Sequence, residues 1–227
     1  MNYCILNHYQ CIQVIGENAR SFLQGQLTNN VMHDSPNLLC NIKGRIIAQI
    51  QVEHHRDQMY LLIQKNLWPK VFSLLEKPAL LSKVNFKESP DIQIYGIIDD
   101  KQSFITCDAT KISGLTEISY EKWHEMRLLQ LQFELYPETV GLFLPHDLGL
   151  ENQWIDFKKG CYRGQEIIAR MHYLGQSKVH LRLFSNPSFL HLNPGDSMEE
   201  QGIIVGEVVD KNDSLMLACV KKNHQFD

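Results

Sequence analysis

The sequence predicts a mixed α+β protein whose C-terminal segment contains strands only. Three observations predict this fold class: paired strand-like runs joined by polar turns, segments with helical spacing of apolar residues, and a final series of strand-like runs after Gly175. We therefore expect a mixed body over residues 1–175 and a small all-β unit over residues 176–227. A unit of roughly fifty residues is small for an independent core, so it should pack on the body.

The strand signals of the body flank short turns. The run "LLCNIKGRIIAQIQV" (38–52) predicts a hairpin that turns at Lys43-Gly44, where a glycine can take a positive φ. The runs "IQIYGII" and "SFITCDA" flank the polar turn 99–102 in the same way. Further strands are expected at 10–15 and 59–64.

Three segments predict helices. The first lies within 17–31, and the second begins with Asn66 as its N-cap and has Pro69 in its first turn, where a missing N–H is harmless. The third is "SYEKWHEMRLLQLQFEL" (119–135), which Ser119 can cap. After Gly175, the run "SKVHLRLF" alternates apolar and polar side chains, and "GIIVGEVVD" and "SLMLACVKK" predict two more strands.

The composition is that of an ordinary globular protein, with 227 residues, 44% hydrophobic residues and a formal net charge of −4. This charge gives no reason to expect direct DNA binding, so an anionic partner would have to meet a local basic patch. The start of the chain has no secretory signal pattern, and no apolar run approaches the ~18 residues of a membrane helix. Six scattered cysteines without a C-x-x-C pair predict reduced thiols and no metal site. We therefore expect a cytoplasmic protein.

The segment "KKGCYRGQE" (158–166) is the richest in chemical groups. It places Cys161 among three cations, and Gly164 can turn the backbone so that the next residues open a short helix with free N–H groups. Cations and helix N-termini favour the reactive thiolate. A buried, inert cysteine is the alternative, and the local residues do not decide between the two.

A basic run surrounds this segment. Residues 158–182 contain six Lys or Arg residues and one acid, Glu166. Such a run can hold a carboxylate or phosphate, or it can be a solvated face. His124 and Glu125 lack the second histidine of H-E-x-x-H and are expected at the surface, and no P-loop, G-x-G-x-x-G or G-x-S-x-G motif occurs.

"KKGCYRGQEIIAR" resembles the K-G-C-Y-x-G-Q-E signature of the YgfZ family, the folate-binding relatives of the glycine-cleavage T-protein. The stretches "FLQGQLTNNV" (22–31), "NIKGRI" (41–46), "MRLLQLQFEL…LPHDLGLENQWIDF" and "GIIVGEVV" resemble other parts of the family, so the similarity runs from about residue 10 to 220. The resemblance implies a T-protein-like folate-binding fold of three α/β subdomains around a central channel, with a small C-terminal β-barrel. It also implies binding of tetrahydrofolate or a derivative, and support of assembly or repair of iron–sulfur enzymes, including tRNA-thiolating enzymes.

The resemblance also assigns candidate site residues. The signature cysteine falls on Cys161, which would be a functional thiol near the mouth of the channel. Arg127 lies where the T-protein fold carries an arginine near folate. The remaining motif positions, as candidates near the folate site, are Lys159, Gly160, Tyr162, Arg163, Gly164, Gln165 and Glu166. The partners that the resemblance implies are folate and iron–sulfur client enzymes or assembly proteins. A lone cysteine cannot hold a cluster by itself, so we do not expect this chain alone to bind one stably.

Two features depart from the T-protein pattern. T-proteins place an acidic pair after the hairpin glycine, whereas this chain has Ala48 and Gln49, which argues against aminomethyl transfer. The chain is also shorter than typical relatives, so part of the barrel or its loops must be trimmed. Three alternatives remain at this stage: a folate-dependent one-carbon transferase, a scaffold that has lost the ligand, and a thiol peroxidase, which lacks a resolving cysteine nearby in the sequence.

Overall fold

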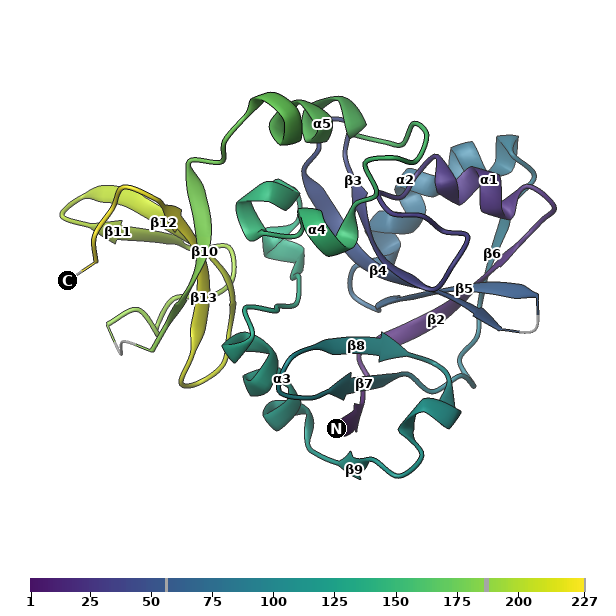
Figure 1. The fold of residues 1–227 in the computed structure, drawn as a ribbon, viewed down its shortest axis with the longest axis horizontal. Helices are drawn as coiled ribbons and strands as arrows, with labels where there is room; N and C mark the ends of the chain where they lie inside the picture. The colour runs from purple at the N-terminus through teal and green to yellow at the C-terminus, as the bar shows by residue number, and fades with distance from the viewer. Residues whose placement is uncertain (56, 186–187, 227) are drawn as a thin grey trace.

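A computed structural model of the protein describes residues 1–55, 57–185 and 188–226. Three β-sheets surround the segment 130–164, which contains only short helices, and the chain ends in the small all-β unit (Figure 1). The fold class expected from the sequence, mixed α+β with strands alone after α5, is confirmed. Within the described residues, no helix is long and apolar enough to cross a membrane.

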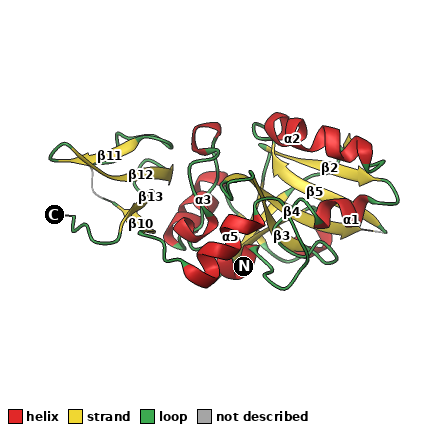
Figure 2. Cartoon of the chain, turned by 90° about the horizontal axis from the view of Figure 1, so that it is seen from above, coloured by secondary structure: helices red, strands yellow, loops and turns green. Residues whose placement is uncertain are grey.

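The largest sheet has five strands in the order β3-β4-β5-β2-β6. Its neighbouring strands pair antiparallel, and the predicted hairpin joins β3 to β4 with Gly44 at a φ of +73°. Helix α2 lies over one face of this sheet (Figure 2). The elements of this part are β2 (Tyr9–Ile15), α1 (Ala19–Gln24), β3 (Ser35–Cys40), β4 (Ile46–His55), β5 (Gln58–Gln64), α2 (Trp68–Leu81) and β6 (Asn85–Glu88).

The second sheet has four strands in the order β8-β7-β1-β9 and packs against α3. Gly96 allows this contact, because a Cβ at that position would lie 2.5 Å from the ring of the fully buried Trp123. The side chain of Ser119 caps α3 as predicted, accepting a hydrogen bond from the backbone N–H of Lys122. The elements are β1 (Asn2–Ile5), β7 (Tyr95–Ile98), β8 (Ser103–Thr106), the 3₁₀ turn η1 (Ala109–Ile112), β9 (Thr116–Glu117) and α3 (Tyr120–Leu129).

The third sheet forms the C-terminal unit, with four antiparallel strands in the order β10-β13-β12-β11. Where the family resemblance predicts a small barrel, the structure has this four-stranded sheet. One of its faces packs on the main core through Val179, Leu181 and Leu183, while the other covers a small core of its own that includes Phe184. Its strands are β10 (Val179–Phe184), β11 (Ser197–Glu200), β12 (Ile203–Lys211) and β13 (Met216–Lys221).

The segment between α3 and β10 fills the space between the sheets (Figure 1). It contains η2 (Pro137–Thr139), η3 (Pro145–Leu148), α4 (Glu151–Trp154) and α5 (Gln165–Leu174). Helix α5 begins where the sequence predicted, after Gly164, whose φ of +80° turns the chain into the helix.

Several local predictions were wrong in detail. The first helix is confirmed within 17–31, but it is only six residues long and ends before Gly25. Helix α2 has Leu67 rather than Asn66 at its N-cap, and it continues through Pro78 to Leu81. Four strands, β1, β6, β9 and β11, were not predicted, since each is two to four residues long and too short for a clear alternation.

Candidate functional site

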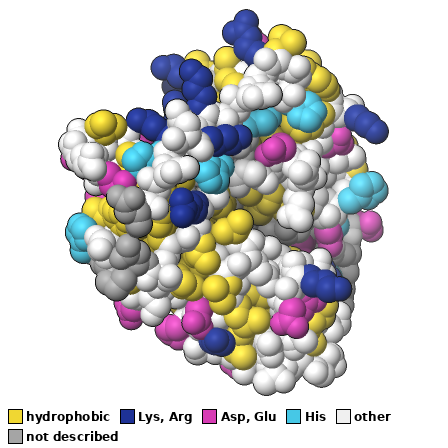
Figure 3. All heavy atoms as spheres, turned by 60° about the vertical axis from the view of Figure 1, so that its left-hand side comes forward, with side chains coloured by type: hydrophobic (Ala, Val, Ile, Leu, Met, Phe, Trp, Pro, Cys, Tyr) yellow, Lys and Arg dark blue, Asp and Glu magenta, His cyan; other side chains and the backbone are white. Residues whose placement is uncertain are grey.

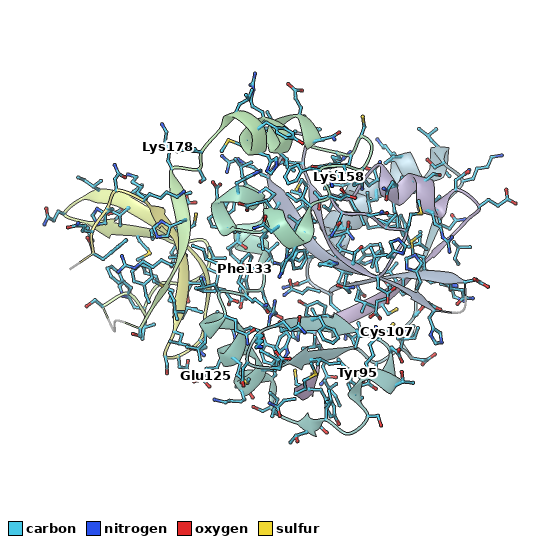
Figure 4. All side chains as sticks on the ribbon, in the orientation of Figure 1. Tyr95, Cys107, Glu125, Phe133, Lys158 and Lys178 are labelled. Atoms are coloured by element: carbon cyan, nitrogen blue, oxygen red, sulfur yellow. The ribbon has the colours of Figure 1, made fainter. Side chains whose placement is uncertain are left out.

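A cavity of about 630 Å³ lies between the sheets and is lined by residues of all three sheets and of the segment between them. This volume is in the range of small-molecule sites. Figure 4 shows Phe133, one of the lining residues, near the centre of the molecule. The lining includes Gln49, Ile50, Gln51 and Glu53 of β4, Ser103, Phe104 and Ile105 of β8, Arg127 of α3, Gln130 to Phe133 after it, Gly149, Leu150, Asn152, Gln153 and Trp154 around α4, and Leu181 of β10.

Arg127 is the buried cation of this cavity, with only 5% of its surface exposed. Its guanidinium lies over the ring of Trp123, 4.5 Å from the centroid, and Nη2 donates a 3.0 Å hydrogen bond to the carbonyl of Phe133. Nη1 lies 3.6 Å from Glu134 Oε1, which is close enough for charge pairing and too long for a hydrogen bond. Within the described residues, Nε and Nη1 therefore have no acceptor. Buried donors of this kind normally have a partner, so a ligand acceptor fits here.

Glu134 holds Arg127 in place and is itself 2% exposed. It accepts hydrogen bonds from the hydroxyl of Tyr120 at 2.9 Å and from Nε2 of His8 at 3.0 Å. Burial alone would raise the pKa of Glu134, but the bond from His8 and the charge of Arg127 hold that pKa below its usual value. The carboxylate is therefore ionised, and it compensates the charge of the cation beside the cavity.

A second buried carboxylate, Asp210 of β12, extends this network to the C-terminal sheet. It accepts hydrogen bonds from Nε2 of His124 at 2.9 Å, from the hydroxyl of Tyr136 at 2.6 Å and from the backbone N–H of Glu134 at 2.8 Å. The prediction that His124 lies at the surface was wrong: it is 6% exposed because α3 turns this side chain toward the C-terminal sheet.

The cavity also contains carboxylates that sequence analysis missed. Glu53, 3% exposed, accepts from the backbone N–H of Cys107 at 2.8 Å and from Lys111 Nζ at 3.2 Å. Asp34 lies 3.6 Å from the same ammonium. Burial alone would lower the pKa of Lys111, but these two carboxylates outweigh that effect and raise it. The period-two spacing of Gln49, Gln51 and Glu53 along β4 is the signal that could have identified this polar wall.

The signature loop 158–166 lies beside this cavity but is not part of its lining, within the described residues. Of the residues predicted for the site, Arg127 alone lines the cavity. Cys161 is exposed, and the labelled Lys158 marks the start of its loop in Figure 4. The structure thus separates the predicted thiol from the predicted ligand site. The other five thiols are free as well, four of them buried.

The loop is fixed by the other stretches that carry the family resemblance. Lys159 Nζ donates to the backbone carbonyls of Leu27 and Asn29 at 2.6 and 2.8 Å, and the backbone N–H of Arg163 donates to the carbonyl of Gly25 at 3.2 Å. Burial lowers the pKa of Lys159 to about 8, with Asp156 acting weakly in the opposite direction. Two segments far apart in the sequence, 25–29 and 159–163, therefore meet at one place.

Gly164 and Tyr162 complete this junction. A Cβ at position 164 would lie 2.5 Å from the carbonyl oxygen of Asn41 and 3.1 Å from Gly44 Cα, so a glycine is required for this contact with the hairpin. Tyr162 is 7% exposed beneath the ammonium of Lys159, 5.3 Å from its ring centroid, and burial raises the pKa of the phenol. The predicted Gly160 and Glu166 are exposed, and Gln165 begins α5.

No family model matches the chain. Among curated proteins it is 33% identical to an uncharacterized protein of Haemophilus influenzae over 218 residues, which cover 86% of this chain and 78% of that protein. It is 27% identical over 255 residues to the tRNA-modifying protein YgfZ of Aliivibrio fischeri strain MJ11, covering 94% of this chain and 79% of that protein. The protein of the same name from Buchnera aphidicola (strain Bp) is 25% identical and covers 86% of this chain and 77% of its own length.

Among solved structures, the chain is similar to the glycine cleavage system aminomethyltransferase T from Bartonella henselae, with a TM-score of 0.70. The match covers 97% of this chain and 78% of that one, at 12% identity, and therefore concerns the fold alone. The expected T-protein-like fold is confirmed. The sequence relatives, which match most of this chain and most of their own length, place the chain in the YgfZ family.

Proposed function

We propose that this chain is a folate-binding factor of tRNA modification. In its finer form, the proposal is a tetrahydrofolate-binding accessory factor for assembly or repair of iron–sulfur proteins, including tRNA-thiolating enzymes, with Cys161 as a functional thiol. The observation that carries it is the central cavity, which the buried Arg127 lines and in which two of its nitrogens, Nε and Nη1, have no hydrogen-bond acceptor among the described residues. The name of the relatives, tRNA-modifying protein, supports the cellular role.

The residues of the cavity fit a folate. The pteridine of folate is a flat ring with hydrogen-bonding groups along its edge, and the apolar side chains of Ile50, Ile105 and Phe133 offer surfaces to such a ring. Arg127 supplies donors, and Oε1 of Gln130, buried without a partner, supplies an acceptor. When bound, a reduced folate supplies one-carbon chemistry at its ring nitrogens; the residues of this chain would hold and orient it.

The carboxylates in the cavity support binding rather than aminomethyl transfer. A transferase needs a carboxylate that is free to act beside the folate nitrogen. Glu53 is already paired with Lys111 and with a backbone N–H, and Asp34 accepts the backbone N–H of His54 at 2.8 Å. The position expected from the T-protein pattern holds the neutral Gln49.

The exposure of Cys161 supports a role toward a second macromolecule. Its thiol lies outside the cavity lining, where an iron–sulfur client or assembly protein can reach it. Within the described part of the chain, no group of three or more His, Cys, Asp or Glu side chains could hold a metal ion. Since clusters usually need four protein ligands, the partner would supply the remaining ones.

Calorimetric titration with tetrahydrofolate under anaerobic conditions tests the ligand. We expect one saturable site in the wild type and in Cys161→Ala, and at least a tenfold weaker affinity in Arg127→Lys, which keeps the charge and loses the planar donor fork. Absence of saturable binding by the folded wild type would overturn folate binding. Equal affinity of Arg127→Lys would remove Arg127 from the ligand site.

Complementation tests the thiol. In a bacterial strain that lacks its own YgfZ-family gene, thiolated nucleosides of tRNA would be measured by mass spectrometry after expression of each variant. We expect Cys161→Ala to fail although it folds and binds folate, and Cys40→Ala, which removes a buried thiol, to restore thiolation. Full restoration by Cys161→Ala would exclude a chemical role for Cys161.

A further inference from the structure

A row of cations runs from α5 into β10 and contrasts with the rest of the chain. Residues 158–182 contain six Lys or Arg and one acid, so the rest of the chain holds 16 basic and 25 acidic residues. From Arg170 to Arg182 no Asp or Glu occurs. The space-filling view shows Lys, Arg and His side chains gathered over the upper part of this side of the molecule (Figure 3). The negative chain thus carries a positive face.

The geometry of β10 arranges part of this face as a regular row. Lys178, His180 and Arg182 alternate with inward-facing apolar residues, so they lie on one side of the strand. Every second residue of a strand is about 6.6 Å further along. This is close to the separation of successive phosphates in an extended nucleic-acid strand. β10 is also an edge strand of its sheet, which leaves the row accessible.

Two neighbours extend the row. The backbone N–H of Lys222 donates to the carbonyl of Lys178 at 3.0 Å, which places a further exposed lysine beside it. Arg170 is exposed on α5, where Tyr173 is 67% exposed. An exposed aromatic ring beside cations is the combination that stacks a base and holds its phosphates. We call the set Arg170, Tyr173, Lys178, His180, Arg182 and Lys222 the α5–β10 face.

Acidic side chains of the described residues do not neutralise the cations of the α5–β10 face. In the part of the chain that the structure describes, Arg170, Lys178, Arg182 and Lys222 form no ion pair. Arg182 lies over the rings of Phe184 and Phe226, at 5.2 and 5.0 Å, which fixes its guanidinium without neutralising it. Like charges held close together repel one another, so a polyanion that covers them is bound favourably.

We propose that the α5–β10 face binds RNA, with the exposed cations and the N–H donor of His180 on its phosphates and Tyr173 against a base. The choice of RNA rests on the proposed role in tRNA modification, and it is independent of folate binding. The regular spacing along β10 and the exposed ring favour a nucleic-acid strand over an acidic protein surface. The protein would then hold tRNA itself close to the enzymes that modify it.

Fluorescence anisotropy with a labelled tRNA transcript tests this inference between about 50 and 200 mM salt. The variant Arg170→Glu/Lys178→Glu/Lys222→Glu changes three exposed cations. The matched control Lys70→Glu/Lys77→Glu/Lys87→Glu changes three exposed lysines on α2 and β6 by the same total charge. We expect at least tenfold weaker binding for the first variant and less than a twofold change for the control.

The salt dependence separates phosphate contacts from stacking. Each lost phosphate contact reduces the slope of log Kd against log salt by roughly 0.7–0.9, so the first triple variant should lose about 2 to 3 from the slope. Tyr173→Ala should weaken binding and leave the slope unchanged. Arg182→Gln should lower the slope by roughly 0.7–0.9, the value for one phosphate contact.

Several outcomes would overturn the proposal. Equal weakening by both triple variants would mean that only net charge matters. A second outcome has two parts: the wild type does not bind tRNA at low salt, and in cells only the first triple variant fails to support tRNA modification. This outcome would assign the face to an acidic protein. Retained tetrahydrofolate binding by the first variant verifies its fold. If the wild type binds tRNA but not folate, the folate part of the proposed function fails and this inference stands.

Discussion

His124 Nε2 and Asp210 Oδ2 lie 2.9 Å apart, although 86 residues separate them in the chain. One belongs to α3 and the other to β12, so this buried pair joins the body to the C-terminal sheet. Asp210 also accepts hydrogen bonds from the hydroxyl of Tyr136 and from the backbone N–H of Glu134. A fully buried carboxylate needs such donors to remain charged, so the sheet is held in place by a polar contact as well as by apolar packing.

The first prediction concerns pH. Burial opposes the charge of His124, but the hydrogen bond and charge of Asp210 raise its pKa above the usual value. The pair therefore stabilises the fold fully below about pH 6.5, and this contribution is lost as the pH rises through the folded pKa. His124→Gln should lower the free energy of unfolding by about 1–3 kcal/mol near pH 6 and by less near pH 9, as measured by urea denaturation. A difference independent of pH would show that the imidazole is neutral.

The second prediction compares two neighbouring lysines. Lys159→Met leaves the carbonyls of Leu27 and Asn29 without the donor that this half-buried lysine supplies, and it should cost about 1–3 kcal/mol in the free energy of unfolding. Lys158→Met, at the exposed neighbour, should stay within about 0.5 kcal/mol. Thermal and urea unfolding of both variants provide the measurement, and equal effects would contradict the half-buried position of Lys159.

The third prediction compares two glycines of the signature loop. Gly164→Ala should destabilise the protein by at least about 2 kcal/mol, because the positive φ is strained for alanine and the new Cβ meets the carbonyl of Asn41. Gly160→Ala is the control, since a Cβ there meets no atom within 4 Å. Differential scanning calorimetry would measure both. A melting temperature of Gly164→Ala equal to that of the wild type would contradict the contact between loop and hairpin.

The fourth prediction concerns thiol reactivity. Four of the six cysteines are buried and Cys107 is half-buried, whereas Cys161 is exposed. Burial raises the pKa of Cys4 to about 12 and raises the pKa values of Cys40 and Cys219 as well, which suppresses their thiolates. A maleimide reagent should therefore modify one thiol rapidly in the native protein, identified as Cys161 by peptide mass spectrometry. Rapid labelling of Cys161→Ala would contradict this assignment.

The sequence predicted the elements that local chemistry determines. The hairpin at Lys43-Gly44, the cap at Ser119 and the start of α5 after Gly164 depend on turn and cap residues that can be read directly. The helix boundary expected at Asn66 was wrong, because an N-cap depends on where tertiary packing lets the helix begin.

The cavity was only partly predictable. Arg127 was identified through the family resemblance. Glu134, which lies beside it, is bonded to Asp210, and these two residues are 76 positions apart and meet only in the folded chain. His124 was misplaced for the same reason, since a lone histidine in a sequence carries no sign of a distant carboxylate. The position of Cys161 outside the cavity lining likewise depends on how the loop docks on the segments around Gly25 and Asn41.

The segment that leads into the signature loop borders both candidate sites. Gln153 and Trp154 line the cavity, and the carbonyl of Trp154 receives the hydroxyl of Thr28 at 2.6 Å. The next residue after Thr28, Asn29, accepts from Lys159, two positions before Cys161. If a ligand in the cavity changes the affinity for a macromolecule at Cys161 through this segment, the macromolecule must change the affinity for the ligand by the same factor. Under the proposed function, this one short segment would link a folate in the cavity to a macromolecule at Cys161.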